Sequence, residues 1–284
     1  MLAKLFAYLQ YVLPKYWLTA VIYRLARVRT ASVKNFLITR FVQLYDVETS
    51  EIKGKLPDDF ATFNDFFIRE LQDDARPVDR DKKTVVSPVD GIVSQAGSLQ
   101  GDTILQAKGL DYSLDDLLAT NLEEARAFAD GTFATIYLAP YNYHRVHAPL
   151  AGTLLSASYV PGDLFSVNAA TAANIRGLFG RNERLILNLA TDRGPAAVIL
   201  VGALNVGSIT TPWTGEIRPR SSGVVENIEL GDESTRLEKG DLLGWFNMGS
   251  TVIVLLPPGV CAWEDNVHAG GTLRMGEVIG RLTD

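Results

Sequence analysis

Residues 249–256 read Gly-Ser-Thr-Val-Ile-Val-Leu-Leu, and this stretch sets the character of most of the chain. A glycine and two hydroxyl residues lead into a run of aliphatic, partly β-branched side chains, which is typical of a β-strand. Similar short runs, punctuated by glycine and proline, recur at residues 85–93, 132–138, 153–160, 185–189, 197–204 and 224–230. The sequence therefore predicts an α+β fold with a β-rich core, arranged as a barrel or sandwich.

The first 46 residues follow a different pattern. Apolar residues recur there at helical spacing with breaks at Pro14 and near Thr30, which predicts three amphipathic helices. Seven basic side chains stand against one acidic one, a net charge of +6, whereas the rest of the chain carries −12. No apolar run reaches the roughly 18 residues of a membrane span. We expect residues 1–50 to form basic helices and residues 51–284 a β-rich catalytic domain.

The partner of the basic helices is open between two interpretations. Amphipathic helices often pack on their own protein or on a second copy. The basic excess and aromatic residues such as Trp17 and Tyr11 instead favour a helical segment that lies on a membrane without crossing it. Nucleic acid is not expected, because large aliphatic residues separate the basic ones and no nucleic-acid-binding motif is present.

The remaining composition limits the chemistry. Cys261 is the single cysteine and cannot form an internal disulfide, which favours a reducing, intracellular setting. No cysteine or histidine spacing suggests a metal site, so we expect none. The N-terminal apolar stretch lacks a small-residue cleavage site, and a signal peptide is therefore not expected.

Two of the three histidines, His144 and His147, lie within one tetrapeptide. Residues three apart on a strand point to opposite faces, so acid–base chemistry fits this pair better than a shared metal. Asp90, in a turn-like Ser-Pro-Val-Asp-Gly segment, and Ser250 could supply an orienting acid and a nucleophile. Each residue alone also fits a bland interpretation, such as an ordinary turn at Asp90 or at Gly249-Ser250.

Several motifs, taken in chain order, resemble one family. They are Leu9-Gln-Tyr-Val-Leu-Pro-Lys15, Phe63-Asn-Asp-Phe-Phe67, Ser87-Pro-Val-Asp-Gly91, Ile104-Leu-Gln-Ala-Lys-Gly109, Tyr143-His-Arg-Val-His147, Tyr159-Val-Pro-Gly-Asp-Leu-Phe-Ser-Val-Asn168, Gly180-Arg-Asn-Glu-Arg184 and Gly249-Ser-Thr251. The last tripeptide alone indicates the family only weakly, but together with the other motifs in this order it indicates the family strongly. Together the motifs resemble the bacterial, pyruvoyl-dependent phosphatidylserine decarboxylases of prokaryotic type I, almost from end to end.

The resemblance implies a proenzyme that cuts itself between Gly249 and Ser250. In the family's triad, Asp90 would orient His147, and His147 would take the proton from the hydroxyl of Ser250. The hydroxyl oxygen would then attack the carbonyl of Gly249. The implied products are a large chain of residues 1–249 and a small chain of residues 250–284 that begins with a pyruvoyl group made from Ser250. These chains would form a heterodimer, and two heterodimers would pair.

The resemblance also implies the substrate, phosphatidylserine in the membrane. The pyruvoyl cofactor would form a Schiff base with its serine amine and accept electrons as carbon dioxide leaves, giving phosphatidylethanolamine. His144 would supply the proton that replaces carbon dioxide, or would contact the phosphate. The loop residues Phe165, Ser166 and Asn168 would bind the substrate. The enzyme would be a peripheral protein of the cytoplasmic face of the inner membrane.

One position departs from the family, which often has aspartate where this chain has Asn142. An amide cannot supply a second negative charge for His147, so Asp90 would act alone. Two other functions stay open at this point. A membrane-associated serine hydrolase could use the same Asp-His-Ser triad, although the Gly-x-Ser-x-Gly elbow is absent. A non-enzymatic, membrane-tethered scaffold would, like the hydrolase, keep its chain whole.

Overall fold

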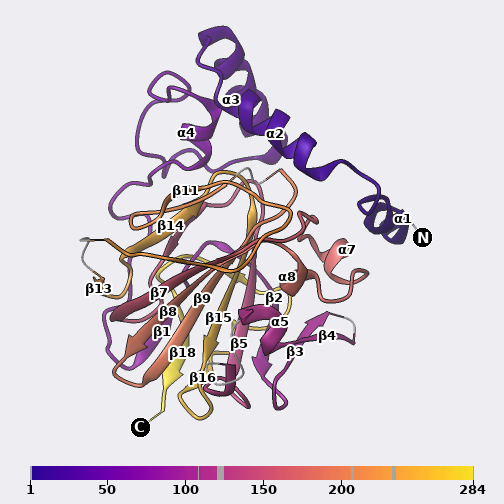
Figure 1. Cartoon of the computed structure of the whole chain (residues 1–284). Helices are drawn as coiled ribbons and strands as arrows, with labels where there is room; N and C mark the ends of the chain where they lie inside the picture. The colour runs from indigo at the N-terminus through magenta and orange to yellow at the C-terminus, as the bar shows by residue number, and fades with distance from the viewer. Residues whose placement is uncertain (1, 108, 120–124, 206–207, 232–234, 284) are drawn as a thin grey trace.

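A computed structural model describes residues 2–107, 109–119, 125–205, 208–231 and 235–283. Its helices within residues 15–45 lie at one end of a strand-rich body (Figure 1). The helices are α1 (Leu2–Leu9), α2 (Lys15–Ala26), α3 (Ala31–Tyr45), α4 (Phe63–Phe67), α5 (Leu114–Leu118), α7 (Ala169–Ala172) and α8 (Leu178–Arg181). The three predicted N-terminal helices and the α+β class with a β-rich core are confirmed.

The strands among these described residues form four antiparallel sheets. They are β1 (Thr84–Val86), β2 (Gly91–Ser98), β3 (Thr103–Ala107), β4 (Leu110–Ser113), β5 (Thr132–Leu138), β6 (Arg145–His147), β7 (Gly152–Val160), β8 (Arg184–Thr191), β9 (Gly194–Val201), β10 (Ile209–Thr211), β11 (Gly215–Ile217), β12 (Glu226–Ile228), β13 (Arg236–Leu237), β14 (Leu242–Phe246), β15 (Ser250–Leu256), β16 (Cys261–Trp263), β17 (Thr272–Leu273) and β18 (Val278–Leu282).

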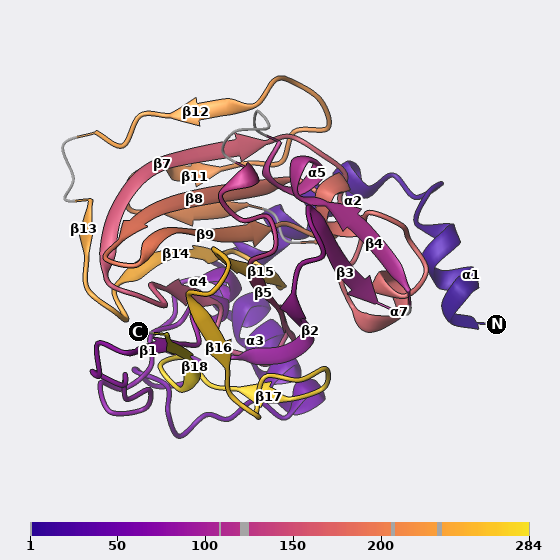
Figure 2. The same cartoon turned by 90° about the horizontal axis from the view of Figure 1, so that it is seen from below.

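The largest sheet has the strand order β12-β7-β8-β9-β15-β5-β2-β17, with β13 also paired to β7. The apolar run Ser250–Leu256 forms β15, which lies between β9 and β5 and has all seven residues buried. Figure 2 shows the curvature of this sheet from below. Over the described residues β12 and β17 end the strand order, so the core is a curved, open sheet and not a closed barrel. The smaller sheets have the orders β11-β10-β14-β6, β1-β18-β16 and β3-β4.

The predicted run at residues 85–93 is divided in two by a turn. β1 ends at Val86 and β2 begins at Gly91, and the hydroxyl of Ser87 donates to the carbonyl of Val89 between them (2.7 Å). Asp90 therefore lies at the end of a turn, where it was expected, outside both strand ladders.

The helix α4 packs between α3 and the residues just before β15, the strand that begins with Ser250. Thr62 caps it by accepting a hydrogen bond from the N–H of Asp65 (3.1 Å). The helix ends at Phe67. Its buried phenylalanines form a second small core with α3, and Met248 packs against this core. The core includes residues from both sides of residue 50, and the proposed division into domains there stays a prediction.

The helix α1 packs beside α7 on another side of the body (Figure 1). The contact runs through Gln10, which follows α1 and is buried. Its side-chain oxygen accepts from the N–H of Ser166 (2.7 Å), and its nitrogen donates to the hydroxyl of Thr171 (3.1 Å). No helix among the described residues is both long and apolar enough to cross a membrane.

Candidate active site at Gly249 and Ser250

Ser250 is the first residue of β15 and pairs in register with Leu138 of β5. Its side chain is fully buried, and its Oγ has no hydrogen-bond partner. Because buried hydroxyls normally have a partner, an orphaned Oγ in the middle of the main sheet requires an explanation other than stability. A hydroxyl held without a competing hydrogen bond can be used as a nucleophile.

His144 faces the residue before this serine. Its Nε2 lies 3.5 Å from the point that a Cβ on Gly249 would occupy, and this nitrogen is also buried without a partner. Its Nδ1 lies 2.8 Å from the carbonyl oxygen of Asn142. A carbonyl can only accept, so Nδ1 carries the proton and Nε2 is left as an acceptor.

The surroundings of His144 keep its ring neutral. Burial, assisted by the positive charge of Arg69, lowers the pKa of His144 to about 3. The ring packs against Phe67, with the two ring centroids 4.0 Å apart. At physiological pH the free Nε2 beside Gly249 is therefore a base that holds no proton.

Arg69 fixes the turn that orients His144. Its Nη2 donates to the carbonyls of Tyr141 (3.0 Å) and Asn142 (3.3 Å), while its Nε and Nη1 are buried without partners. Burial lowers the pKa of Arg69 to about 10, so the group stays charged at neutral pH. The side chain of Asn142 accepts from the N–H of Ala139 (2.7 Å). Asn142 thus acts on His144 through its backbone carbonyl, and its amide serves the turn.

His147 lies in β6 and uses both ring nitrogens. Its Nδ1 donates to the carbonyl of Gly240 (2.8 Å), and its Nε2 accepts from the hydroxyl of Tyr143 (3.1 Å). Burial lowers the pKa of His147; the charge of Arg145 acts in the same direction, and the more distant charge of Asp90 opposes both. The hydrogen bonds between the described residues do not connect His147 with Asp90 or with Ser250.

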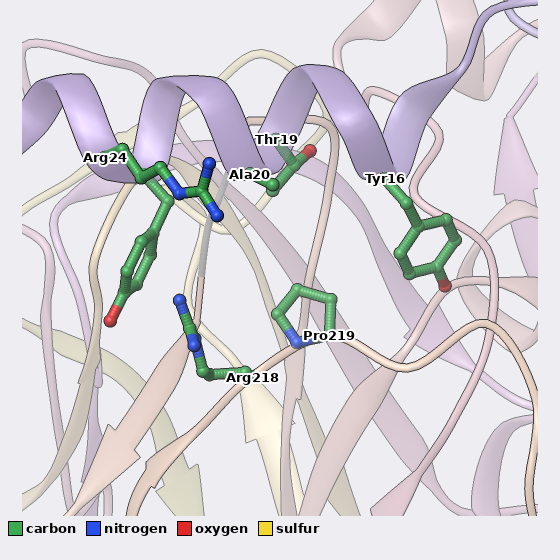
Figure 3. Close-up of a pocket in the computed structure, with 7 residues that line it drawn as sticks. Tyr16, Thr19, Ala20, Arg24, Arg218 and Pro219 are labelled. Atoms are coloured by element: carbon green, nitrogen blue, oxygen red, sulfur yellow. The ribbon is translucent and has the colours of Figure 1, made fainter.

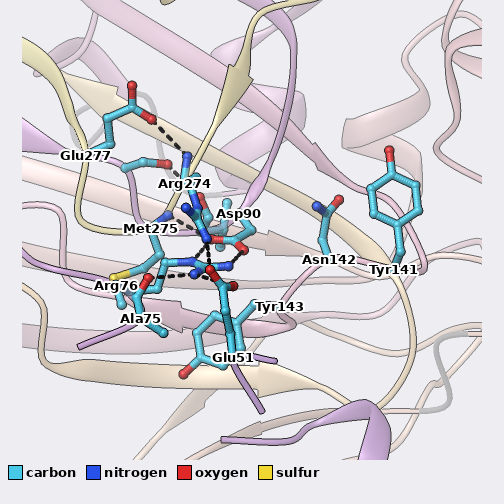
Figure 4. A network of polar contacts seen from close by, with 12 residues as sticks. Glu51, Ala75, Arg76, Asp90, Tyr141, Asn142, Tyr143, Arg274, Met275 and Glu277 are labelled. Carbon is cyan, nitrogen blue, oxygen red and sulfur yellow. Dashed lines mark hydrogen bonds and ion pairs between the residues drawn. The ribbon is translucent and has the colours of Figure 1, made fainter. Parts of the chain in front are cut away.

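Asp90 is the centre of an ionic network (Figure 4). Its carboxylate accepts from Nε (2.8 Å) and Nη2 (2.5 Å) of Arg76 and from the N–H of Met275 (2.8 Å). Arg76 also pairs with Glu51 (2.8 Å), which in turn pairs with Arg274. The carboxylate is therefore held by Arg76, and its influence reaches His147 as charge and not as a direct hydrogen bond.

A cavity of about 200 Å³ opens beside Gly249. Its walls come from α3, α4, the end of β5, residues 203–205, the two residues before β15 and the loop before α7, and Ser166 and Asn168 of that loop line it. Phe165, the third residue expected to bind substrate, is not in its lining and is buried under the N-terminal helices. The Nζ of Lys15 lies 3.6 Å from the centre of the Phe165 ring.

The fold thus gathers His144, Ser166 and Asn168 around Gly249 and Ser250, whereas Asp90 and His147 are held by two separate sets of hydrogen bonds. Sequence reasoning missed three contributors: Arg69, Phe67 and Tyr143. Phe67 and Tyr143 lie within quoted motifs, so a signal was present, whereas nothing in the sequence marks Arg69 as buried. The described residues contain no group of three or more His, Cys, Asp or Glu side chains that could hold a metal ion.

Comparison with known proteins shows the family of this chain. The family model described as phosphatidylserine decarboxylase matches residues 63–281, and a second model, described as PSD, matches residues 5–46. Curated proteins named phosphatidylserine decarboxylase proenzyme are similar over nearly their whole length. The one from Saccharophagus degradans is 45% identical over 98% of this chain and 97% of its own. That from Marinobacter nauticus is 44% identical over 99% of both. The chain belongs to the phosphatidylserine decarboxylase family, whose members are carboxy-lyases.

Proposed function

We propose that this chain is a proenzyme that cuts its own Gly249–Ser250 bond and then converts phosphatidylserine to phosphatidylethanolamine. One observation carries the proposal: the buried, unpartnered Oγ of Ser250 lies next to a residue that faces the free Nε2 of a neutral His144. The relatives are named phosphatidylserine decarboxylase proenzymes, which supports both the substrate and the processing.

The proposed cleavage uses only groups of the chain. Ser250 Oγ gives its proton to an imidazole and attacks the carbonyl carbon of Gly249. The peptide C–N bond breaks, the nitrogen takes a proton, and an ester joins the two residues. Loss of the α-proton and breakage of the Cβ–O bond release residues 1–249 with a carboxylate end. The dehydroalanine left at position 250 takes up water, releases ammonia and becomes a pyruvoyl group.

Two histidines compete for the role of base. The family resemblance favours His147 with Asp90, whereas the geometry of the uncleaved chain favours His144, because the Nε2 of His147 already accepts from Tyr143. An imidazole with a pKa of about 3 can accept a proton but has none on Nε2 to give. His144 must therefore first gain a proton if it later acts as the acid. Variants His144→Gln and His147→Gln, followed by the rate of cleavage, separate the two assignments.

The residues present fit a pyruvoyl group at position 250. The orphaned Ser250 Oγ marks the atom that the maturation removes, and the unpartnered Nε2 of His144 is available to a group formed there. The pyruvoyl carbonyl supplies Schiff-base chemistry, an electron sink for the loss of carbon dioxide from an amino acid headgroup. Ser166 and Asn168, which line the cavity at Gly249, would orient that headgroup.

The N-terminal helices support a peripheral position on the membrane. Large apolar side chains are exposed along them: Leu5, Phe6, Tyr8, Leu9, Tyr11, Val12, Trp17, Val21, Leu25, Phe36, Leu44 and Tyr45. So many exposed apolar side chains within one segment suit a membrane interface. Phe41 and Tyr45 of α3 also line the cavity at Gly249, so a headgroup could enter it from the bilayer surface. We propose the cytoplasmic face of the inner membrane as the location.

Intact-mass spectrometry tests the maturation. The purified wild-type chain should appear as residues 1–249 and a pyruvoyl-capped fragment of residues 250–284, whereas Ser250→Ala should stay whole. Ser98→Ala, which changes an exposed serine, is the matched control and should be processed normally. A Ser250→Ala chain that still divides at this bond would contradict the proposal. So would a whole wild-type chain with full decarboxylase activity, and a whole chain that hydrolyses esters would favour the serine hydrolase.

A further inference from the structure

A second cavity, of about 300 Å³, lies between α2 and the segment that follows β11. It shares no lining residue with the cavity at Gly249. Its lining residues are Tyr16, Thr19, Ala20, Tyr23, Arg24, Arg218 and Pro219. Neither the proposed cleavage nor the proposed decarboxylation uses any of them.

Two arginines converge on this cavity. Figure 3 shows the guanidinium of Arg24 extending from α2 and that of Arg218 extending toward it from the opposite wall. Neither forms an ion pair with a carboxylate of the described residues. Nearby Glu216 is already engaged, because it accepts from Nη2 of Arg27 (2.6 Å) and from the hydroxyl of Tyr23 (3.1 Å). Two cations that face each other repel, and an anion bound between them would relieve that repulsion.

Contacts in the walls of the cavity position Arg218 and Thr19. The guanidinium of Arg218 lies over the ring of Tyr23, 4.3 Å from its centre, and Arg27 lies 3.6 Å from the same ring. The hydroxyl of Thr19 accepts from the N–H of Asn205 (3.1 Å), which leaves its own hydrogen available for donation. A positioned guanidinium loses less conformational freedom on binding than a free one, so this geometry favours a ligand with several acceptor oxygens.

The surface next to Arg24 indicates what carries the anion. Trp17, Val21 and Leu25 recur every four residues along α2, and all three are exposed, Trp17 by 64%. They form an apolar strip along α2. Arg24 comes three residues after Val21, so it lies beside this strip on the helix surface. A small soluble anion would make no contact with such a strip, whereas the acyl chains of a lipid would pack against it.

We propose that this cavity binds the phosphate of an anionic phospholipid, between Arg24 and Arg218, with the lipid's acyl chains along Trp17, Val21 and Leu25. The site rests on the membrane position proposed above but is separate from the cavity at Gly249. The lipid held there is therefore an anchor and not the molecule that is converted. It fixes α2 against the bilayer and so holds the Gly249 cavity close to its substrate.

Vesicle co-sedimentation of the full chain tests the site. The vesicles are phosphatidylcholine alone and phosphatidylcholine with phosphatidylglycerol. The informative variant is Arg24→Lys with Arg218→Lys, which keeps both charges but loses the forked donors that grip a phosphate. The control is Arg29→Lys with Arg40→Lys, two exposed arginines of the same basic N-terminal region, one between α2 and α3 and one in α3. We expect the first pair to weaken binding to the anionic vesicles about five-fold or more, at an unchanged melting temperature, and the control pair to change it less than about two-fold.

Three results would overturn the proposal. One is a lysine pair that binds anionic vesicles as tightly as wild type, since charge alone would then explain the attraction. Another is equal weakening by the control pair. The third is inorganic phosphate alone protecting the chain against heat as well as the anionic vesicles do, which would make the cavity a site for a soluble anion. Self-cleavage is followed on the same samples by gel, so a failure of the proposed maturation is distinguishable from a failure of this lipid site.

Discussion

Replacing Asp90 by asparagine should weaken the fold as well as the self-cleavage. The carboxylate forms a buried ion pair with Arg76, with side-chain exposures of 8% and 9%, and also accepts from the N–H of Met275. Asparagine keeps the size and one acceptor oxygen, but it removes the charge and turns an NH2 group toward a guanidinium that can only donate. Breaking a buried pair by removing one partner costs about 3–5 kcal/mol.

Two features of the network place the expected loss just below that range or at its lower limit. Arg76 keeps its second partner, Glu51, at 2.8 Å, and asparagine can still accept one hydrogen bond. We therefore expect the free energy of unfolding to fall by about 2–3 kcal/mol. That is a large share of the roughly 5–15 kcal/mol by which folded domains are stable.

Urea unfolding measures this loss best in a Ser250→Ala background, where every molecule is a single uncleaved chain. With a slope of about 2–3 kcal/mol per molar urea, the midpoint should move down by about 1 M. Asp73→Asn is the matched control: Asp73 is 98% exposed and only 3.8 Å from Lys53, so its loss should cost less than about 0.5 kcal/mol. If Asp90→Asn abolished cleavage in the wild-type background and left the urea midpoint unmoved, the structural role given to the Arg76 pair would be refuted.

Three further predictions concern the site and the helices. Burial lowers the pKa of His144 to about 3, so the unfolded chain binds more protons below pH 6.5; the Ser250→Ala chain should lose about 2 kcal/mol of stability on this account between pH 6.5 and 5. Urea midpoints measured across that range should fall as the pH falls, and His144→Gln should make this fall smaller. If the variant showed the same pH dependence as its parent, groups other than His144 would be its cause. Tyr143→Phe removes the donor to Nε2 of His147 and should slow cleavage about five-fold, judged by gel time courses, because a bond of about 1 kcal/mol no longer orients the ring. Cleavage at the wild-type rate would mean that the hydroxyl only fills space. Leu44→Glu, at a side chain 76% exposed, should leave the melting temperature unchanged and weaken vesicle binding about five-fold. Leu155→Glu, on the exposed face of β7, should leave vesicle binding unchanged. Equal weakening by the two variants would show that α3 does not contact the membrane.

The strands of the core could be predicted because buried strands consist mainly of apolar and β-branched residues. The runs at residues 132–138 and 251–256 became β5 and β15 almost without change of bounds, since nearly every position in them needs an apolar or β-branched side chain. The run at residues 85–93 was predicted as one strand and is two. Pro88 lies within it, and a residue without an N–H interrupts a central ladder.

The geometry of the histidine pair could not be read in the same way. The expectation that His144 and His147 lie on opposite faces assumed one strand, but β6 begins only at Arg145. His144 belongs to the turn before it, where no periodicity fixes the direction of a side chain. Its position depends on the carbonyl of Asn142, and that carbonyl in turn is held by Arg69, 73 residues away in sequence. Contacts of this length leave no local pattern.

The place of Ser250 in the sheet also explains how a cut chain can stay assembled. In the uncleaved chain β15 pairs with β5 from Ser250 to Leu256 and with β9 from Thr251 to Leu255, and every one of its residues is buried. Further along, β16 and β18 pair with each other, and β18 pairs with β1 of the large part. Breaking the bond before Ser250 removes one covalent link and none of these ladders. We therefore expect residues 250–284 to remain bound after maturation, with the new end at the margin of the cavity that Gly249 lines, because leaving would expose the most apolar strand of the core.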